Sequence, residues 1–585
     1  MRQDTFTRCL FNRLLSAGSI AAVVCAANPA LAADFFASNA SQINTAMNSA
    51  GPGDTVIMTD GIWTNQNIDF EGFGNSANPI TLRPQTPGGV TLNGSSTLSI
   101  SGDWLVADGL QFIGGTTSGT NVIEFRGGNG GATNSRLTNT TMIDYNPAST
   151  STRYQWVGVY GNNNRIDHNY FENQNHNGVT IVDWVGKTGN STGSNQIDSN
   201  YFYNMPSGGG ENGWETIRIG DSANSMTHTN DIVENNLFYQ VNGEIEIISN
   251  KTGSNIYRNN TFFESEGTLT LRHGNNALVE GNFFLGNGKN QTGGIRVIGE
   301  DHTIINNYLE GLDGRNGGAI SISAGVENSA LNQYFQVKNA LIAHNTIIDI
   351  DDAAIKLDDG LGSSSRTLRG ENVTIANNLI RSTDETLFDG TEGSNWTWEG
   401  NIAFGQSLGT KAGDPGITVT DPLITLDADG LWRLTGSSPA INNGAGDYSS
   451  LFTDDMDGQS RIGIFDIGAD EFSAAAIIRR PLQVGDVGPL WLFPPSTLTG
   501  DLDGDGFVGI NDLNIVLANW NQNVPPADPA ADPSGDGFVG IDDLNEVLGN
   551  WNAGTPPGQA NSHIPEPTTL GLLAATGLML LRRRQ

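Results

Sequence analysis

The chain has 585 residues, 75 of them glycine, and its 63 acidic against 29 basic side chains give a formal net charge of −34. So acidic a chain is not expected to bind nucleic acid, and holding a polyanionic ligand would require a local basic patch or bound cations. Carboxylates in this excess also suit calcium, which takes oxygen ligands.

The N-terminal segment predicts export. A basic start, the apolar run LLSAGSIAAVVCAA and an Ala-Leu-Ala site are typical of a secretory signal, here residues 1–32. Both cysteines, Cys9 and Cys25, lie inside it. The exported chain therefore has no disulfide to stabilise it, and burial, backbone pairing and metal ions must do so.

A repeated phrase follows in residues 33–474, in which an apolar pair precedes an asparagine and two more apolar residues follow it. Successive asparagines stand 22 to 38 residues apart, with the short intervals clustered and the long ones typical of loop insertions. Short alternating strands separated by Gly, Asn, Asp and Ser surround each of them, and little helical periodicity is found outside the signal and the C-terminal module. The asparagines are Asn169, Asn200, Asn236, Asn260, Asn282, Asn307, Asn345 and Asn378.

This repeat predicts an all-β fold, a right-handed parallel β-helix in which each unit is one coil. Propellers use longer repeats, and leucine-rich repeats need a leucine framework that is missing here. Inward Ile, Val, Leu and Phe would stack into a continuous core, and the turn asparagines would form ladders from coil to coil. The turn-like stretch up to Phe472 is expected to close the solenoid, with capping roles for Arg461 and Asp466.

Charged residues gather in the segment GEIEIIS. If it is a strand, Ile245 and Ile247 point into the core while Glu244 and Glu246 lie side by side outside. Two carboxylates this close repel, and a bound Ca²⁺ is the simplest remedy. Asn212, 32 residues before Glu244, is about one coil away and would add an amide oxygen.

Lys251 and Arg272 are 21 residues apart, close to the shortest coil interval, so both are expected in one cleft beside the glutamates. This set suits β-elimination on a uronate polymer: a cation neutralises the sugar carboxylate, a lysine removes the C5 proton, and an arginine stabilises charge or protonates the leaving oxygen. The spacing alone fits a surface salt-bridge ladder nearly as well.

At these positions the sequence resembles polysaccharide lyase family 6, the chondroitinase B and alginate lyase family of parallel β-helices. Its first coils are similar to PGDTVIMTDGIW, PITLRPQTPGGVTLNG and LSISGDWLVADGLQF, and its catalytic coils to NGWETIRIG, EIEIISNK and GTLTLRHG, together covering most of residues 34–472. The resemblance implies Lys251 as the base and Arg272 as its partner acid or charge stabiliser. It also implies Asn212, Glu244 and Glu246 as calcium ligands, and Arg218 and His273 as substrate contacts or coil supports.

The resemblance makes an acidic polysaccharide the expected substrate, alginate first and dermatan or chondroitin sulfate next. Two other interpretations stay open. One is a non-catalytic β-helix that binds glycans at a surface, for which the lysine and arginine would be dispensable. The other is a pectate lyase, which the paired glutamates, lysine and arginine fit less well.

A linker (475–499) leads to two copies of a calcium-loop motif in residues 500–553, each followed by an amphipathic helix. The acidic and hydroxyl side chains fall at loop positions 1, 3, 5 and 12. The pair resembles a type I dockerin, which implies a cohesin-type partner; a calcium-stabilised spacer is the alternative. The predicted ligands are Asp501, Asp503, Asp505 and Asp512 in the first loop and Asp532, Ser534, Asp536 and Asp543 in the second.

The last segment, residues 563–585, has a Pro-Glu-Pro motif, a short apolar run and three consecutive arginines. The run is shorter than the roughly 20 residues that span a bilayer. The segment resembles a PEP-CTERM sorting tail, which implies a secreted or cell-surface protein whose membrane contact is confined to this tail. A true C-terminal membrane anchor is the alternative.

Overall fold

The computed structural model describes residues 32–186, 193–210, 212–427, 429–493, 499–502, 507–525 and 527–553. The predicted sorting tail and all but the last residue of the predicted signal lie outside these ranges. Within them, no helix has both the length and the apolar character needed to cross a bilayer.

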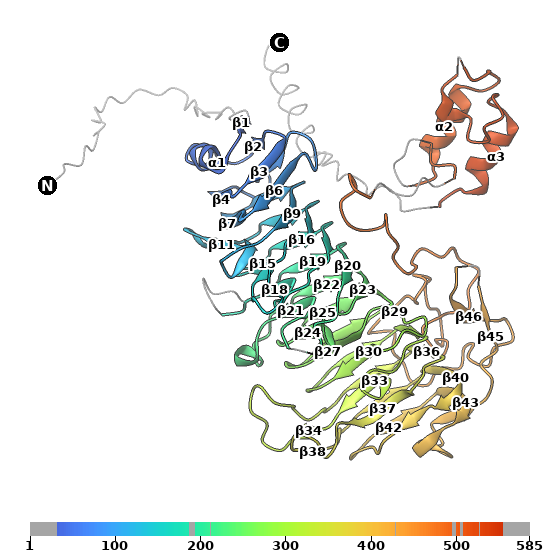
Figure 1. The fold of residues 1–585 in the computed structure, drawn as a ribbon. Coiled ribbons are helices and arrows are strands. Elements are labelled where there is room, and N and C mark those ends of the chain that lie inside the picture. Colours follow the sequence, from blue (N-terminus) through green and yellow to red (C-terminus); the bar gives the residue numbers. More distant parts are fainter. Residues whose placement is uncertain are drawn as a thin grey trace, which may run out of the picture.

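Residues 34–419 wind into the predicted parallel β-helix, whose coils stack into three long sheets (Figure 1). Sheet 1 runs through fourteen strands from β1 (Asp34–Ala37) to β42 (Thr397–Glu399). Sheet 3 runs through fourteen strands from β3 (Gly61–Thr64) to β44 (Ile417–Val419).

Sheet 2 carries the charged residues singled out above. Its twelve strands are β4 (Asn67–Phe73), β7 (Thr97–Asp103), β10 (Asn121–Glu124), β15 (Gln155–Val159), β18 (Ile181–Asp183), β21 (Ile217–Ile219), β24 (Glu246–Asn250), β27 (Gly267–Leu271), β30 (Thr292–Val297), β33 (Gly318–Ser323), β37 (Ala353–Asp359) and β41 (Phe388–Asp389). Each strand pairs in parallel with its neighbours, so residues one coil apart in sequence lie next to each other on this face.

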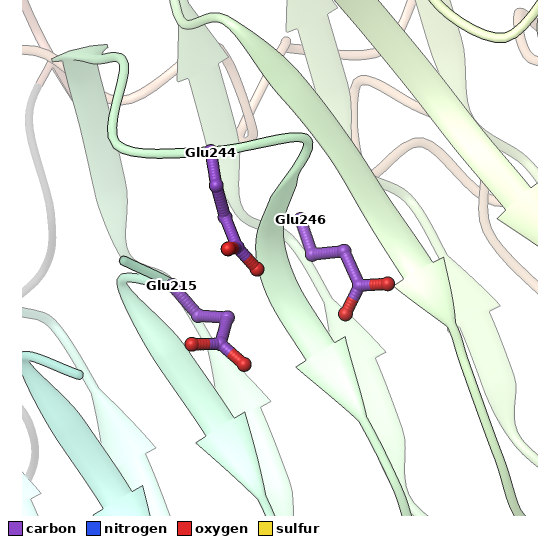
Figure 2. Close-up of side chains that lie close together, drawn as sticks. All are labelled: Glu215, Glu244 and Glu246. Atoms are coloured by element: carbon purple, nitrogen blue, oxygen red, sulfur yellow. The ribbon is translucent and has the colours of Figure 1, made fainter. Parts of the chain in front are cut away.

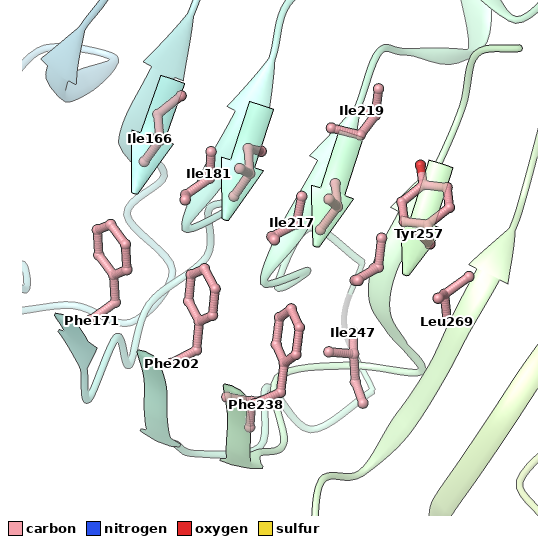
Figure 3. Packing of buried hydrophobic residues seen from close by; sticks show 14 of the residues in the cluster. Ile166, Phe171, Ile181, Phe202, Ile217, Ile219, Phe238, Ile247, Tyr257 and Leu269 are labelled. Atoms are coloured by element: carbon pink, nitrogen blue, oxygen red, sulfur yellow. The ribbon is translucent and has the colours of Figure 1, made fainter. Parts of the chain in front are cut away.

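The core is a stack of side chains that repeats from coil to coil (Figure 3). Consecutive rings lie 5.2, 4.9, 4.7 and 4.5 Å apart between centroids, with interplanar angles of 12° or less. Isoleucines of sheets 1 and 2, such as Ile166 and Ile217, face them across the interior. The stacked rings are Phe171, Phe202, Phe238, Phe262 and Phe284.

The predicted asparagine ladder is confirmed. From Asn200 on, the Oδ1 atom of each ladder asparagine accepts the backbone N–H of the asparagine one coil earlier, at 3.0–3.1 Å, and Asn169 Oδ1 accepts that of Thr140. The ladder continues to Asn401, beyond the predicted set. These side chains are fully buried at the turn between sheets 1 and 3, so they satisfy backbone groups that water cannot reach.

One helix in this domain was not predicted. Helix α1 (Ala40–Met47) packs against β4 near the first coil (Figure 1), with Ala40, Ile43 and Ala46 buried and Asn39 capping its N-terminus. Eight residues are too few to establish a helical period in sequence against the surrounding strand pattern.

The expectation that residues 438–472 close the end of the solenoid is wrong. They fold back along its flank, where Phe452 and Phe465 cover the outward apolar side chains Ile305, Ala343 and Ala376. Arg461 is buried there, with Nη2 donating to Asn306 Oδ1 at 3.0 Å, and Asp466 accepts the backbone N–H of Asn442 and of Phe472. Arg461 and Asp466 are structural as predicted, but they help to hold this segment against the side of the solenoid and do not cap its end.

The segment 482–493 is not a free linker. It runs back toward the N-terminal coils along the outside of sheet 3, and we call it the strap. The Leu482 N–H donates to Thr261 Oγ1, the Gly488 N–H to Ser199 O, and the Trp491 Nε1–H to Asn139 O, at 2.8–2.9 Å. Phe493 then packs edge-on against Tyr170.

The ladder yields a stability prediction. Replacing Asn260 with alanine removes the acceptor for the Asn236 N–H and the donor to Val233 O, both in the dry interior. Since each orphaned buried group costs about 1–3 kcal/mol, we expect the free energy of unfolding to fall by about 3 kcal/mol or more, measured by denaturant unfolding. The control is Asn129→Ala, because Asn129 is exposed. Equal losses of stability in the two variants would contradict a stabilising role for the ladder.

Candidate active site

Three glutamates converge at the start of neighbouring strands of sheet 2 (Figure 2). Glu215 stands two residues before β21, Glu244 lies in the bend before β24, and Glu246 is the first residue of β24. One carboxylate oxygen from each lies within 4.8 Å of the other two. The three side chains therefore form one acidic cluster, the glutamate cluster.

The strand expected over GEIEIIS begins later than predicted. Glu244 and Ile245 are in a bend, and a register shift between Glu246 and Ile248 interrupts the pairing of β24 with β27. As a result Ile247 and Ile248 are both buried, and Ile245 is partly exposed. Such an irregularity re-aims side chains, and here it lets Glu244 reach toward the preceding coil.

The cluster concentrates negative charge in a shielded place. Burial, with the nearby Glu215 and Glu246 carboxylates, raises the pKa of Glu244 to about 8, although the Gly213 N–H donates to it at 2.9 Å. Glu215 is fully buried, and its Oε2 has no hydrogen-bond partner within the described part of the chain. An orphaned buried carboxylate oxygen beside two more carboxylates fits a hard divalent cation such as Ca²⁺.

Glu215 was missed in the sequence, although a signal for it existed. Ile217 pairs with Ile248, so Glu215 and Glu246 occupy the same position on adjacent strands, 31 residues apart. Asn212, the amide predicted to complete the site, is exposed three residues earlier. Its role as a ligand stays a prediction.

Two basic groups approach the cluster from the side of β21. The Lys251 Nζ lies 3.4 Å from Glu215 Oε1, and Arg218 Nη1 lies 4.0 Å from the same oxygen. The Arg218 guanidinium stacks over the Trp184 ring at 4.7 Å, which keeps it buried and fixed. Lys251, just after β24, retains 13% side-chain exposure and can meet a ligand on this face.

Arg272, just after β27, closes the other side. Its Nε lies 3.6 Å from Glu246 Oε1, its Nη1 donates to Gln333 O at 2.9 Å, and its guanidinium lies 4.3 Å from the centre of the Tyr334 ring. Burial lowers the pKa of Arg272, while Glu246 opposes that shift. The loop carrying Tyr334 was not predicted as part of the site, because Tyr334 is 62 residues from Arg272 in sequence.

His273 is in a supporting place. It is 1% exposed, its Nε2 is 3.1 Å from Ser222 Oγ, and its Nδ1 is 3.4 Å from Arg272 Nη1. Burial, together with Arg272 and Lys251, lowers the pKa of His273 to about 3, so the ring is neutral at physiological pH. The ring therefore contacts Ser222 and Arg272, and both expectations for His273, substrate contact and coil support, stay predictions.

The C-terminal repeats form a separate small core. Helices α2 (Ile510–Ala518) and α3 (Ile541–Gly549) follow the two predicted calcium loops, and Val516 and Val547 pack together between them. In the second loop, Asp532 accepts the backbone N–H groups of Asp536 and Gly537, and Asp543 accepts that of Ser534.

The first loop is described in part. Asp512 is fully buried and accepts the Leu502 N–H at 2.6 Å, which places position 12 of that loop against its start. Asp503 and Asp505 lie outside the described residues, whereas Asp501 belongs to the described range 499–502. Calcium binding by either loop stays a prediction.

The chondroitinase B family model matches residues 37–421. A variant of the PL6 family alginate lyase AlyGC is 35% identical, with a TM-score of 0.68, over 78% of this chain and 58% of that one. A mannuronic acid specific family 6 lyase from human gut microbiota is 29% identical (TM-score 0.59) over 67% and 92% of the two chains. Pedsa3628 of Pseudopedobacter saltans is 27% identical (TM-score 0.57) over 78% and 99%.

The chain therefore spans less than two thirds of the AlyGC length. No curated protein matches it.

The geometry predicts which side chains hold a cation. Glu215→Gln removes one charge from the cluster and should lower the affinity for Ca²⁺ at least about tenfold, measured by isothermal titration calorimetry. Asn212→Ala in parallel tests whether the exposed amide also contributes. Glu300→Gln, at a surface ion pair with Lys338, is the control. Unchanged affinity in Glu215→Gln would exclude this carboxylate as a ligand.

Proposed function

The chain belongs to the chondroitinase B family of polysaccharide lyases, and from this premise we propose that it cleaves a uronate polymer by β-elimination, with alginate as the first substrate. The observation that carries the proposal is the glutamate cluster flanked by Lys251 and Arg272, each within 3.6 Å of one of its carboxylates. The names of the relatives, the alginate lyase AlyGC and a mannuronic acid specific lyase among them, support the choice of polymer.

The residues divide the reaction between them. Lys251 accepts the C5 proton of a uronate, electrons move to form the C4–C5 double bond, and the C4–O bond breaks. Arg272 faces the departing oxygen and stabilises its negative charge, or supplies the proton that it takes up. The products are a new reducing end and a 4,5-unsaturated uronate at the opposite new end.

The C5 proton is weakly acidic until the adjacent carboxylate is neutralised. Ca²⁺ held by Glu215, Glu244 and Glu246 would supply that neutralisation. A cation bound at the cluster would also let a very acidic protein bind an acidic polymer, because it would replace repulsion between the carboxylates and the polymer with attraction. Buried Arg218 lies beside the same Glu215 oxygen that pairs with Lys251, and buried His273 contacts Arg272.

Dermatan or chondroitin sulfate is the alternative substrate, because the family model that matches the chain is that of chondroitinase B. We further propose that the protein is exported, that its C-terminal repeats bind calcium in the manner of a dockerin, and that a cohesin-type protein is their partner. A spacer role for these repeats is the alternative.

The catalytic assignment is tested with ultraviolet absorbance of unsaturated uronate, using full-length protein with calcium and separate samples of alginate, dermatan sulfate and pectate. Wild type is expected to act on alginate. Lys251→Ala should lower kcat about 10²–10⁴-fold, because it removes the general base, while circular dichroism stays unchanged. Lys338→Ala, outside the glutamate cluster, is the control.

Full activity of Lys251→Ala would refute the lysine as base. Absence of cleavage of all three polymers by folded wild type would instead favour a glycan-binding surface without catalysis.

Calcium binding should depend on pH. Because the pKa of Glu244 is raised to about 8, this carboxyl holds a proton at pH 6–7 that the cation must displace. The apparent affinity is therefore expected to fall by up to about tenfold per pH unit below 8. The affinity is measured by calorimetry at pH 6, 7 and 8.5. The Glu244→Gln variant is titrated in parallel, and its heat is subtracted to remove any calcium binding by the C-terminal loops. An affinity that stays constant with pH would contradict a protonated Glu244.

A further inference from the structure

Two aspartates are buried together behind the candidate active site. Asp183 ends β18 in sheet 2, and Asp231 directly precedes β22 (Ile232–Glu234) in sheet 1. Each is 1% exposed, and their carboxyl groups lie within hydrogen-bonding reach of each other. Asp183 Oδ1 and Asp231 Oδ2 have no donor among the described residues.

Asp231 occupies one rung of a second side-chain ladder. Asn164 N donates to Asn195 Oδ1, Asn195 N to Asp231 Oδ1, and Asp231 N to Asn255 Oδ1, at 2.8–2.9 Å. The Nδ2 groups of Asn164 and Asn195 also donate to backbone carbonyls one coil back. The Asp231 carboxylate accepts the backbone N–H as an asparagine would, but its side chain has no N–H to donate in return. Its second oxygen instead faces Asp183.

Asp183 has apolar neighbours in its row. It pairs with Val159 on β15 and Ile219 on β21, both buried. Asn195 Nδ2 donates to its Oδ2 at 3.2 Å. Burial and the facing Asp231 raise its pKa, and burial also raises that of Asp231. The remaining titratable group facing the pair in the described structure is the buried Tyr257 phenol, whose pKa is raised as well.

We propose that Asp183 and Asp231 share one proton at physiological pH, with Asp183 Oδ1–H donating to Asp231 Oδ2, and that this bond positions the turn that carries Lys251. One proton supplies the missing donor for both orphaned oxygens and halves the buried charge. The two aspartates are positioning residues, and only their link to Lys251 rests on the proposed function.

The connection to Lys251 is a short chain of hydrogen bonds. The backbone N–H of Asp231 donates to Asn255 Oδ1 at 2.8 Å, and Asn255 Nδ2 donates to Asn250 Oδ1 at 2.7 Å and to Thr252 Oγ1 at 2.9 Å. These two residues flank Lys251, whose own N–H donates to Ile219 O at 2.8 Å. Both neighbours of the lysine are thereby tied to the ladder rung that the shared proton completes.

The proton is tested through stability, without lyase activity. Above the ordinary aspartate pKa of 3.8, folding takes up one proton in wild type, so the unfolding equilibrium constant should rise about tenfold per pH unit from this pair. Asp183→Asn keeps one negative charge and provides an amide donor in place of the proton. Its melting temperature relative to wild type should therefore increase steadily from pH 5 to pH 9. Parallel pH profiles would overturn the proposal.

A buried metal ion is the competing occupant of the pair. The same melting curves are recorded in EDTA with tetramethylammonium as the salt cation, and again after adding sodium or calcium. Equal responses of wild type and Asp183→Asn support the proton. A cation that stabilises wild type alone would overturn it.

The positioning role has a separate readout. Asp183→Ala leaves Asp231 without a donor and should lower kcat on the cleaved polymer about tenfold with KM changed less than twofold, while Asp183→Asn restores kcat. Equal kcat for Asp183→Ala and wild type would refute the link to Lys251. The stability measurements alone would then decide whether the two aspartates share a proton. If wild type cleaves no polymer, the proposed function fails and the pH test of the pair still stands.

Discussion

The hydrogen bonds between successive coils are the constraint on which the rest of this molecule depends. They hold neighbouring strands about 4.8 Å apart and give every side chain one neighbour above and one below. Phenylalanine follows phenylalanine in the core, and asparagine follows asparagine in the turn between sheets 1 and 3. Stacking identical side chains is favourable for rings and amides, because each ring packs against the face of the next ring and each amide oxygen accepts a hydrogen bond from the neighbouring coil.

The same rule makes stacked carboxylates costly. Glu215 and Glu246 hold one position on adjacent coils, and a bulge brings Glu244 between them. Asp183 and Asp231 meet in the interior in a comparable way. A rigid repeat cannot move such groups apart, so each group of carboxylates requires a positive partner. Lys251 and Arg272 lie beside the glutamate cluster, where we propose a bound cation as well, and a shared proton is our proposal for the interior pair.

The candidate active site draws its rigidity from this frame. Lys251 and Arg272 each follow the last residue of a strand of sheet 2, where the next turn begins, and their neighbours are bonded into the ladders. The ion pairs with Glu215 and Glu246 then orient both side chains toward one place on the face. Positioning of this kind is what a proton transfer needs, because geometry decides first whether a base can reach its proton.

Much was determined by the sequence alone: the parallel β-helix and its asparagine ladder, the strands around Glu246 and Arg272, and the helices after the two C-terminal loops. These depend on local period and on spacing near one coil length, both of which can be read along the chain. The sequence did not reveal Glu215, Tyr334, the flank formed by residues 422–472, the course of the strap, or the meeting of Asp183 with Asp231. Those were decided by the tertiary structure, because insertions of varied length change which residues share a row, and because a surface left apolar by one coil is covered by whichever distant segment can reach it.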